Sequence, residues 1–432
     1  MSNGGTPKAR GLPGFLRRSL RMNYDDDDDS AAVNIHLQDK DNTASMATPP
    51  ASPAGQRPTR LQQPLTPTLP NPLLPKPTME EMKSEASTTG DSTTSSLSTG
   101  SRRDAFISPQ TIPSTLGFQG SYRYRQFEAV IHADVVNMSE LRKTSWNGVP
   151  EQYRAQTWKL LLGYLPVNSS RRKHTLDRKR AEYRDAIAQH YDIDDDTRTM
   201  QEQETLRQVL VDVPRTAPDV KLFRHVKVRR ALARLLYIWA QRHPASSYVQ
   251  GINDLATPLM VVFLGEYFDI TDVMNATIMD ETSDDLMQEV EADCYWCLTN
   301  LLAGIQDHYT SDQPGVQRMV MRLEELVNRI DRNLCQYLRG VGIEFMQFGF
   351  KWMNCLLLRE FNLRCVMRLW DTYFSEGDGG FEDFHVYVCA AFLCQFSLQL
   401  QSMEFDELFG FMQRIPTDEW TDTEIEVLLS QA

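Results

Sequence analysis

Two side chains in this sequence, Arg215 and Gln250, are of types that can assist phosphoryl transfer from a nucleotide. The arginine closes residues 209–215 (VLVDVPR), and the glutamine lies in residues 247–251 (SYVQG). Transfer of the terminal phosphoryl group of GTP spreads negative charge over the transferred oxygens and requires a water molecule in line with the bond that breaks. One guanidinium and one amide can meet both needs, without a metal site or a nucleophile in the protein that supplies them.

Each of these residues also has a simpler interpretation. Arg215 lies between Pro214 and Pro218, so a loop rather than an α-helix is expected at this point. Taken alone, Arg215 is best explained as a solvated loop arginine that pairs with Asp212. Gln250 carries no charge and cannot act as a base, but its amide can accept from and donate to one water molecule. The alternative for Gln250 is an ordinary Gln-Gly turn.

The two segments resemble the paired signatures IxxDxxR and YxQG of the TBC-domain family of Rab GTPase-activating proteins, with Val209 in place of the usual isoleucine. Residues 154–161 (RAQTWKLL), preceded by residues 148–150 (GVP), are similar to the family's RxxxWxxL motif. Three motifs in the order of the family are far more specific than one. The resemblance runs from residue 148 to the C-terminus and includes Trp352, residues 359–361 (REF) and residues 369–371 (LWD).

The resemblance implies a role for each residue of these motifs. In the family, the arginine enters the nucleotide site of the Rab and the glutamine replaces the Rab's own, so catalytic roles fall on Arg215 and Gln250. We expect Arg154 and Trp158 to be structural. No cofactor or metal of the chain's own is implied, because GTP and Mg²⁺ are bound by the Rab. Residues expected to support the two loops or to contact the Rab are Asp212, Tyr248, Gly251, Asn253 and Asp254.

Three further segments are most similar to the Golgi-associated branch called TBC domain family member twenty-two: residues 142–146 (RKTSW), 291–296 (EADCYW) and 368–373 (RLWDTY). This similarity implies a GTP-bound Golgi or early secretory Rab as partner and recruitment from the cytoplasm to Golgi membranes. It also implies binding of a Golgi adaptor with an acyl-CoA-binding domain, or of phospho-binding dimers, through the N-terminal tail. The helical pattern over residues 421–432 is shorter than the resemblance leads us to expect.

The sequence offers no other chemistry. It contains no GxxxxGK[ST], HExxH or GxSxG motif, so we expect no hydrolase site of its own. The acidic residues 192–196 mimic the start of an EF-hand loop, but Thr197 and Gln203 replace its glycine and its glutamate. Cys294 and Cys297 form one CxxC without a second pair, which predicts core thiols rather than a zinc site.

Composition narrows the class of protein further. A formal net charge of -13 argues against binding to nucleic acid, which would require a basic surface. Seven scattered cysteines, without an apolar signal segment at the start, indicate reduced thiols in the cytoplasm. The longest uncharged stretch, residues 386–403, contains too many Gln and Ser residues for a membrane span and predicts one buried core helix.

The chain divides into three parts. Residues 1–116, with an acidic run and Pro-rich and Ser/Thr-rich tracts, are poor in aromatic residues and are expected to be disordered. Residues 117–147 are expected to form a helical lead-in to a domain that spans residues 148–432. Apolar residues recur at helical spacing in residues 231–239 and 316–330, and no alternating strand pattern is found. These patterns predict an all-α, multi-helix fold.

Two functions from different classes fit these observations. The first is a GTPase-activating protein for a Rab, which supplies Arg215 and Gln250 in trans. The second is a non-catalytic scaffold with the TBC fold, which would recruit Golgi adaptor proteins. The presence of both side chains favours the activator, because a degenerate family member would often lack one of them.

Overall fold

A computed structural model describes residues 122–432, and within this range the secondary structure is helical. One isolated antiparallel bridge joins Val135 and Asn168, and no strand is formed by the described residues. The predicted all-α fold is confirmed. The expectation of disorder in residues 1–116 concerns a part of the chain outside the described range.

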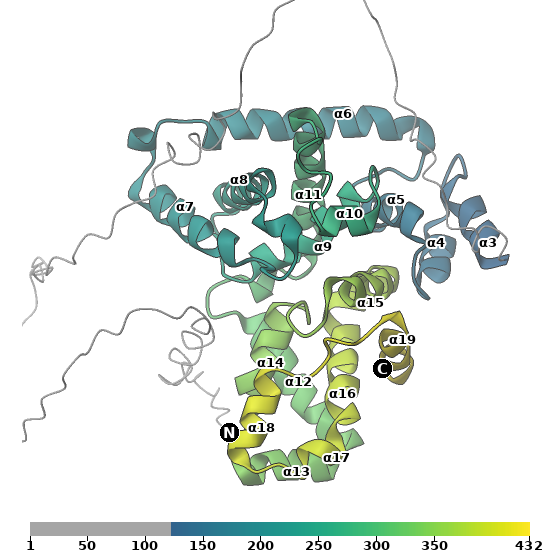
Figure 1. Ribbon diagram of the computed structural model, residues 1–432, viewed down its shortest axis with the longest axis vertical. Helices are drawn as coiled ribbons and strands as arrows, with labels where there is room; N and C mark the ends of the chain where they lie inside the picture. Colours follow the sequence, from purple (N-terminus) through teal and green to yellow (C-terminus); the bar gives the residue numbers. More distant parts are fainter. Residues whose placement is uncertain (1–121) are drawn as a thin grey trace, which may run out of the picture. The chain divides into compact units, whose positions relative to one another are not determined.

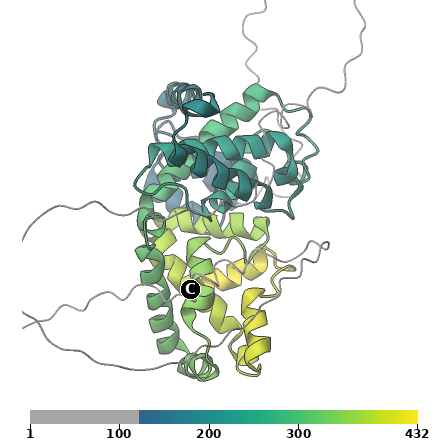
Figure 2. The same cartoon turned by 90° about the vertical axis from the view of Figure 1, so that its left-hand side faces the viewer.

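The helices form two groups that follow one another along the chain (Figures 1 and 2). The first group comprises α3 (Tyr122–Ile131), α4 (Met138–Ser145), α5 (Glu151–Leu161), α6 (Ser169–Ala186), α7 (Met200–Asp212), α8 (Val226–Arg242), α9 (Ile252–Leu264), α10 (Ile270–Met274) and α11 (Asp284–Gly304). The second comprises α12 (Pro314–Ile330), α13 (Arg332–Val341), α14 (Phe345–Asn354), α15 (Leu363–Glu376), α16 (His385–Gln395), α17 (Ser397–Leu400), α18 (Phe405–Gln413) and α19 (Asp422–Gln431).

Helix α15 connects the two groups. It contacts α4, α5 and α9 of the first group and α19 of the second, and nearly all of its residues are buried. In Figure 1, α15 lies between the teal helices and the yellow-green helices. Helix α15 therefore supports α9, the helix that begins directly after the loop at residues 247–251.

The lead-in helices α3 and α4 pack against α5 through a small apolar core of their own. Phe127 of α3 stacks on Tyr153 of α5 with ring centroids 5.7 Å apart, and Ile131 and Leu141 are fully buried beside them. Burial of each of these side chains contributes about 1.5–3 kcal/mol. The lead-in is thus packed onto the helix that carries the RxxxWxxL motif.

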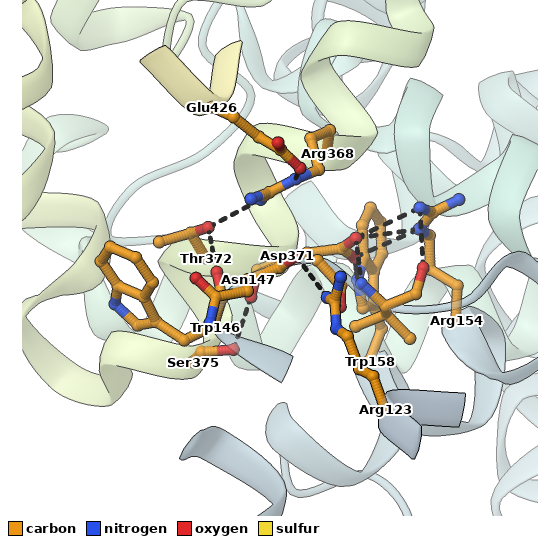
Figure 3. A network of polar contacts seen from close by, with 12 residues as sticks. Arg123, Trp146, Asn147, Arg154, Trp158, Arg368, Asp371, Thr372, Ser375 and Glu426 are labelled. Carbon is orange, nitrogen blue, oxygen red and sulfur yellow. Dashed lines mark hydrogen bonds and ion pairs between the residues drawn. The ribbon is translucent and has the colours of Figure 1, made fainter. Parts of the chain in front are cut away.

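A buried carboxylate on α15 receives several hydrogen bonds from α5 and from the loop before it (Figure 3). Asp371, which has no exposed surface, accepts a hydrogen bond from the Trp158 indole at 2.7 Å and one from the Val149 backbone N–H at 2.8 Å. The Arg154 guanidinium lies 3.2 Å from both carboxylate oxygens. These contacts support the proposal that Arg154 and Trp158 serve the fold rather than the reaction.

The same network continues outward from α15 (Figure 3). The Thr372 hydroxyl donates to the Trp146 carbonyl at 2.7 Å and accepts from Arg368 at 2.9 Å. Arg368 in turn lies 3.5 Å from Glu426 on α19. The loop after α4, helix α15 and helix α19 are therefore joined by polar contacts as well as by apolar packing.

Several sequence predictions can be compared with this fold. The expected end of α5 near Gly163 is confirmed, since the helix stops at Leu161 and Gly163 adopts a φ of +70°. The expected amphipathic helix over residues 316–330 is present as α12, but Ile330 is 60% exposed because it lies at the end of that helix. Cys294 and Cys297 are buried free thiols, as predicted.

The prediction of one buried core helix over residues 386–403 is wrong. Helix α16 ends at Gln395, Phe396 leaves the helical region with φ -97° and ψ 9°, and the short helix α17 follows. Leu398 on α17 is 88% exposed. The Gln and Ser residues of this stretch thus mark a break in the helix. Within residues 122–432, no helix combines the length and the apolar character needed to cross a bilayer.

We predict that Asp371→Ala destabilises the fold strongly. The substitution leaves the Arg154 guanidinium, the Trp158 indole N–H and the Val149 N–H without their common acceptor, and removal of one member of a buried ion pair costs about 3–5 kcal/mol. Urea unfolding followed by circular dichroism measures the change. Arg414→Ala is the control, because both Arg414 and Asp418 are more than three-quarters exposed and such pairs contribute about 0–1 kcal/mol. Equal effects of the two substitutions would contradict this role of Asp371.

We predict a loss of stability on acidification that depends on two buried histidines. Burial lowers the pKa of His385 to about 3 and that of His308 to about 4. Both imidazoles therefore stay neutral in the folded protein, whereas the unfolded chain takes up protons below about pH 6.5. Because the unfolded state binds more protons, stability falls as the pH drops from 6.5 towards 4, by roughly 1.4 kcal/mol per pH unit for each histidine.

Urea midpoints between pH 6.5 and pH 5 check this expectation. His385→Gln removes one titrating group and should make the dependence on pH shallower than in the wild-type chain. The exposed His174→Gln is the matched control and should leave the dependence unchanged. A slope that is the same in all three proteins would show that His385 makes no contribution.

Candidate functional site

Arg215 lies at the end of a short 3₁₀ turn, η3 (Val213–Arg215), that follows α7. Helix α7 begins with a capping box between Thr199 and Glu202 and ends at Asp212. Pro214 has no backbone N–H to donate to the preceding turn, which favours an end of the α-helix at this point. Arg215 is exposed and lies outside α-helix, as predicted.

Gln250 lies near the end of the loop that joins α8 to α9. It is exposed, whereas Tyr248 two residues earlier and Gly251 directly after it are buried. Gly251 precedes the first residue of α9 and has a φ of +110°, a conformation that residues with a Cβ rarely adopt. The glycine thus lets the chain turn from the loop into a wholly buried helix immediately after Gln250.

A buried set of hydrogen bonds joins the two loops beneath these exposed side chains. The Tyr248 hydroxyl lies 2.9 Å from Asp212 Oδ2. Asn253 Nδ2 donates to the Thr216 hydroxyl at 3.0 Å, and Asn253 Oδ1 accepts from the Gly251 N–H at 3.0 Å. Asn253 therefore holds the residue after Arg215 with one end of its amide and the residue after Gln250 with the other.

Thr216 extends this contact to α7. Its hydroxyl donates to the Asp212 backbone carbonyl at 3.0 Å. That bond satisfies one of the carbonyls that a helix leaves unpaired at its C-terminus. The hydroxyl therefore ties the chain beside Arg215 both to the end of α7 and to α9.

The carboxylate of Asp212 lies in an environment that opposes its ionisation. Burial raises the pKa of Asp212 above its ordinary value, and the nearby Asp254 raises it further. The hydrogen bond from Tyr248 and the positive charges of Arg215 and Arg359 act in the opposite direction. Arg215 is thus close enough to Asp212 for their charges to interact. Perturbed carboxylates of this kind are frequent at functional sites.

The first turn of α9 is anchored by an ion pair. Asp254 is buried, and its Oδ2 lies 2.7 Å from the Arg359 guanidinium. A carboxylate in the first turn also interacts favourably with the dipole of its helix. Pro258 cannot donate to the Asp254 carbonyl one turn earlier, but the Thr257 hydroxyl does so at 2.7 Å. Asp254 thus holds the first turn of α9 in place.

One group within residues 122–432 has the residue types of a cation site. Side-chain atoms of Asp307, His308 and Glu382 lie within 4.8 Å of one another. However, the Arg318 guanidinium contacts the carboxylates of Asp307 at 2.8 Å and Glu382 at 3.5 Å. The arginine already supplies the positive charge that an ion would bring, so we assign no metal to this group. The acidic residues 192–196 are exposed, and Asp195 pairs with Arg198.

Sequence reasoning missed three residues that hold the loops: Thr216, Asn354 and Gln313. Thr216 directly follows Arg215, so its position was a usable signal. Asn354 Nδ2 donates to the Gln250 carbonyl at 3.2 Å, and Gln313 donates to Asn354 Oδ1 at 2.8 Å. No spacing rule links these residues to the motif, because they approach it only through the packing of the second group of helices.

Comparison with known proteins places this geometry in a family. The sequence model of the Rab-GTPase-TBC domain matches residues 151–401. The chain is 47% identical over 312 residues to GTPase-activating protein gyp1 of Schizosaccharomyces pombe and 48% identical over 311 residues to TBC1 domain family member 22B of Homo sapiens. Each match covers 72% of this chain and 60% of the relative, so this chain spans well under the full length of either protein.

A solved structure agrees with these matches. The crystal structure of the Ypt/Rab-GAP domain of Gyp1p aligns with a TM-score of 0.68 at 45% identity and covers 72% of this chain and 96% of that one. The chain belongs to the Rab-GTPase-TBC domain family. Within the family, its similarity to the branch of TBC domain family member twenty-two, expected from residues 142–146, 291–296 and 368–373, is confirmed.

We predict that Gly251→Ala distorts the loop that carries Gln250. A Cβ at this position would lie 2.5 Å from Asn354 Nδ2, and the φ of +110° disfavours any side chain. A residue forced into such a conformation costs roughly 1–3 kcal/mol, which thermal unfolding can measure. Gly340→Ala is the control, because Gly340 lies within α13 with open space around it. We expect this control to stabilise the protein by about 0.5–1 kcal/mol. If Gly251→Ala does not lower the thermal stability, the close contact and the positive φ of Gly251 do not constrain the loop.

Proposed function

We propose that this chain accelerates GTP hydrolysis by a Rab-family small GTPase, to which it supplies Arg215 and Gln250 in trans. The observation that carries the proposal is the buried hydrogen-bonded set below the two loops. Asn253 contacts the chain next to both residues, so two exposed side chains from different loops share one support. A shared support is what a reaction that needs both groups at once would require.

The arginine would act on charge. In the transition state, negative charge develops on the oxygens of the transferred phosphoryl group, and a guanidinium placed there stabilises it. An arginine supplied in trans raises GTP hydrolysis by about 10³ to 10⁵, which corresponds to roughly 4–7 kcal/mol of the barrier. The position of Arg215 at the exposed end of η3 supports this role. Asp212 and Tyr248, buried beneath it, would keep the turn in place.

The glutamine would act on the attacking water. An amide offers one acceptor and two donor positions, so Gln250 can hold a water molecule and the phosphoryl oxygen beside it. The carbonyl and the flanking glycine of Gln250 are held by the protein, while its side chain is exposed. Gly251, Asn253 and Asp254 would support this loop, and the surrounding helices would contact the mobile segments of the Rab.

The proposal also includes the membrane at which the chain would act. Similarity to the branch of TBC domain family member twenty-two supports a Golgi or early secretory Rab as substrate and recruitment from the cytoplasm to Golgi membranes. Adaptors with an acyl-CoA-binding domain and phospho-binding dimers are further proposed partners. The tail to which their binding is assigned lies outside the described residues.

We expect Arg215→Ala and Gln250→Ala each to abolish most of the stimulated hydrolysis. Single-turnover phosphate release from a panel of purified, GTP-loaded Rab proteins measures the effect. Loss of the arginine should reduce the rate by about 10³ or more, because the developing charge loses its partner. Arg414→Ala and Gln399→Ala, which remove exposed side chains of the same two types elsewhere in the chain, should leave the rate unchanged.

The same panel distinguishes the activator from the scaffold. Stimulation of one or a few Rabs, lost in both variants while their circular dichroism is unchanged, would establish the activator and identify its substrate. Binding of a Rab without any stimulation by the wild-type chain would instead support a non-catalytic TBC-fold scaffold. Full activity of either variant would exclude that residue from the reaction.

A further inference from the structure

The backbone of Gln250 is held by a side chain from the second group of helices. Asn354, the last residue of α14, donates from Nδ2 to the Gln250 carbonyl at 3.2 Å and is itself buried. The Asn354 amide also packs so closely against Gly251 that a methyl group there would collide with it. The peptide unit between Gln250 and Gly251 therefore has little freedom to rotate.

A second amide decides which way the Asn354 side chain faces. Gln313 Nε2 donates to Asn354 Oδ1 at 2.8 Å and to the His308 carbonyl at 2.7 Å. Because Gln313 presents a donor, the oxygen of the Asn354 amide turns towards it and the NH₂ group turns towards Gln250. The buried Tyr309 hydroxyl also donates to the Asn354 backbone carbonyl at 2.7 Å. Asn354 is thus held at both its side chain and its backbone.

Unusual backbone conformations cluster around these contacts. Among the described residues, seven residues other than glycine have a positive φ, and six of them flank the two loops or the two amides; the exception is Ala276. Such conformations persist where the surrounding structure enforces them, and they are concentrated at functional sites. The concentration indicates that the amides and the loops form one constrained unit. The six residues with a positive φ that lie there are Ala217, Ser247, Asp312, Gln313, Leu356 and Leu357.

We propose that Asn354, oriented by Gln313, is a positioning residue for Gln250. It contacts neither GTP nor the Rab; it fixes the peptide unit of Gln250 and thereby the direction in which the glutamine amide leaves the surface. This inference rests on the proposed function of Gln250. A displacement of about 1 Å at a reacting group can cost about 10²-fold in rate. Loss of the contact should therefore lower kcat, with little effect on KM for the Rab.

Two substitutions test the role without removal of any side chain. Asn354→Asp keeps the shape and the acceptor for Gln313 but replaces the donor to the Gln250 carbonyl with an oxygen. Gln313→Glu places a carboxylate against Asn354, so the Asn354 amide should turn its NH₂ group away from Gln250. We expect each substitution to lower kcat by about 10- to 100-fold. The reaction is measured on the Rab of the panel that the wild-type chain stimulates most.

A matched control separates this role from a general effect of the substitution. Asn362 Nδ2 also donates to a backbone carbonyl, but this is the carbonyl of Trp420, at 2.8 Å, and not that of Gln250. Asn362→Asp makes the same chemical change and loses the same kind of hydrogen bond. It should leave kcat unchanged. If Asn362→Asp lowers kcat as much as Asn354→Asp does, the proposal is wrong.

A double-mutant cycle shows whether Asn354 acts through the glutamine side chain. In the Gln250→Ala background, Asn354→Asp should cause no further loss, because there is no amide left to position. In the Arg215→Ala background the full 10- to 100-fold loss should remain. Equal further losses in both backgrounds, or a change in KM alone, would overturn the proposal.

Hydrogen–deuterium exchange gives a readout that does not depend on any Rab. Asn354→Asp should speed the exchange of a peptide that covers residues 246–253 and leave peptides of α16 unchanged. Faster exchange without a change in kcat would refute the positioning role while leaving the function of Gln250 intact. If the wild-type chain stimulates no Rab, the proposed function fails and this inference fails with it. The two failures are therefore distinguishable.

Discussion

The buried carboxylate of Asp371 is the group on which the arrangement of the helices most depends. It is fully shielded from solvent and accepts hydrogen bonds from Arg154, Trp158 and the Val149 backbone. A carboxylate is costly to desolvate, and the cost is offset only where its acceptor positions are filled. Three donors from α5 and the preceding loop must therefore converge on one point of α15. Since α15 also contacts α9, the helix that starts just after Gln250 is placed by the same constraint.

At the candidate site, nearer the surface, a buried polar side chain again fixes the relative positions of two segments through its hydrogen bonds. The two exposed side chains come from a short 3₁₀ turn and from a loop, and a segment held only by apolar contacts could adopt several orientations. Here Asn253 uses its donor for one loop and its acceptor for the other. A buried amide has directional requirements that a leucine does not, so the network stabilises one relative position of the two loops. The exposed side chains of Arg215 and Gln250 thus have fixed backbones beneath them.

Sequence reasoning predicted the parts of this structure that short-range rules govern. Pro214 ends α7, the apolar spacing of residues 316–330 forms α12, and the RxxxWxxL spacing places Trp158 in the core. The partner of Arg154 could not be predicted in this way, because Asp371 is 217 positions away and only the packing of α15 on α5 brings the two together. The break after α16 was missed for a related reason. The absence of charge in residues 386–403 predicts burial, but α16 ends at Gln395 and Leu398 is exposed, because the chain reaches the surface there.

Near the site, two bulky residues adopt a backbone conformation that residues with a side chain normally avoid. Leu356 and Leu357 both adopt a left-handed conformation, which costs an ordinary residue about 1–2 kcal/mol. Both are fully buried, and the burial of each leucine contributes about 1.5–3 kcal/mol. The core can therefore sustain the strain. The two leucines follow the end of α14 closely. The last residue of that helix, Asn354, contacts the Gln250 carbonyl. Six of the seven described residues other than glycine with a positive φ lie beside the two loops or the two amides, a concentration that is typical of functional sites.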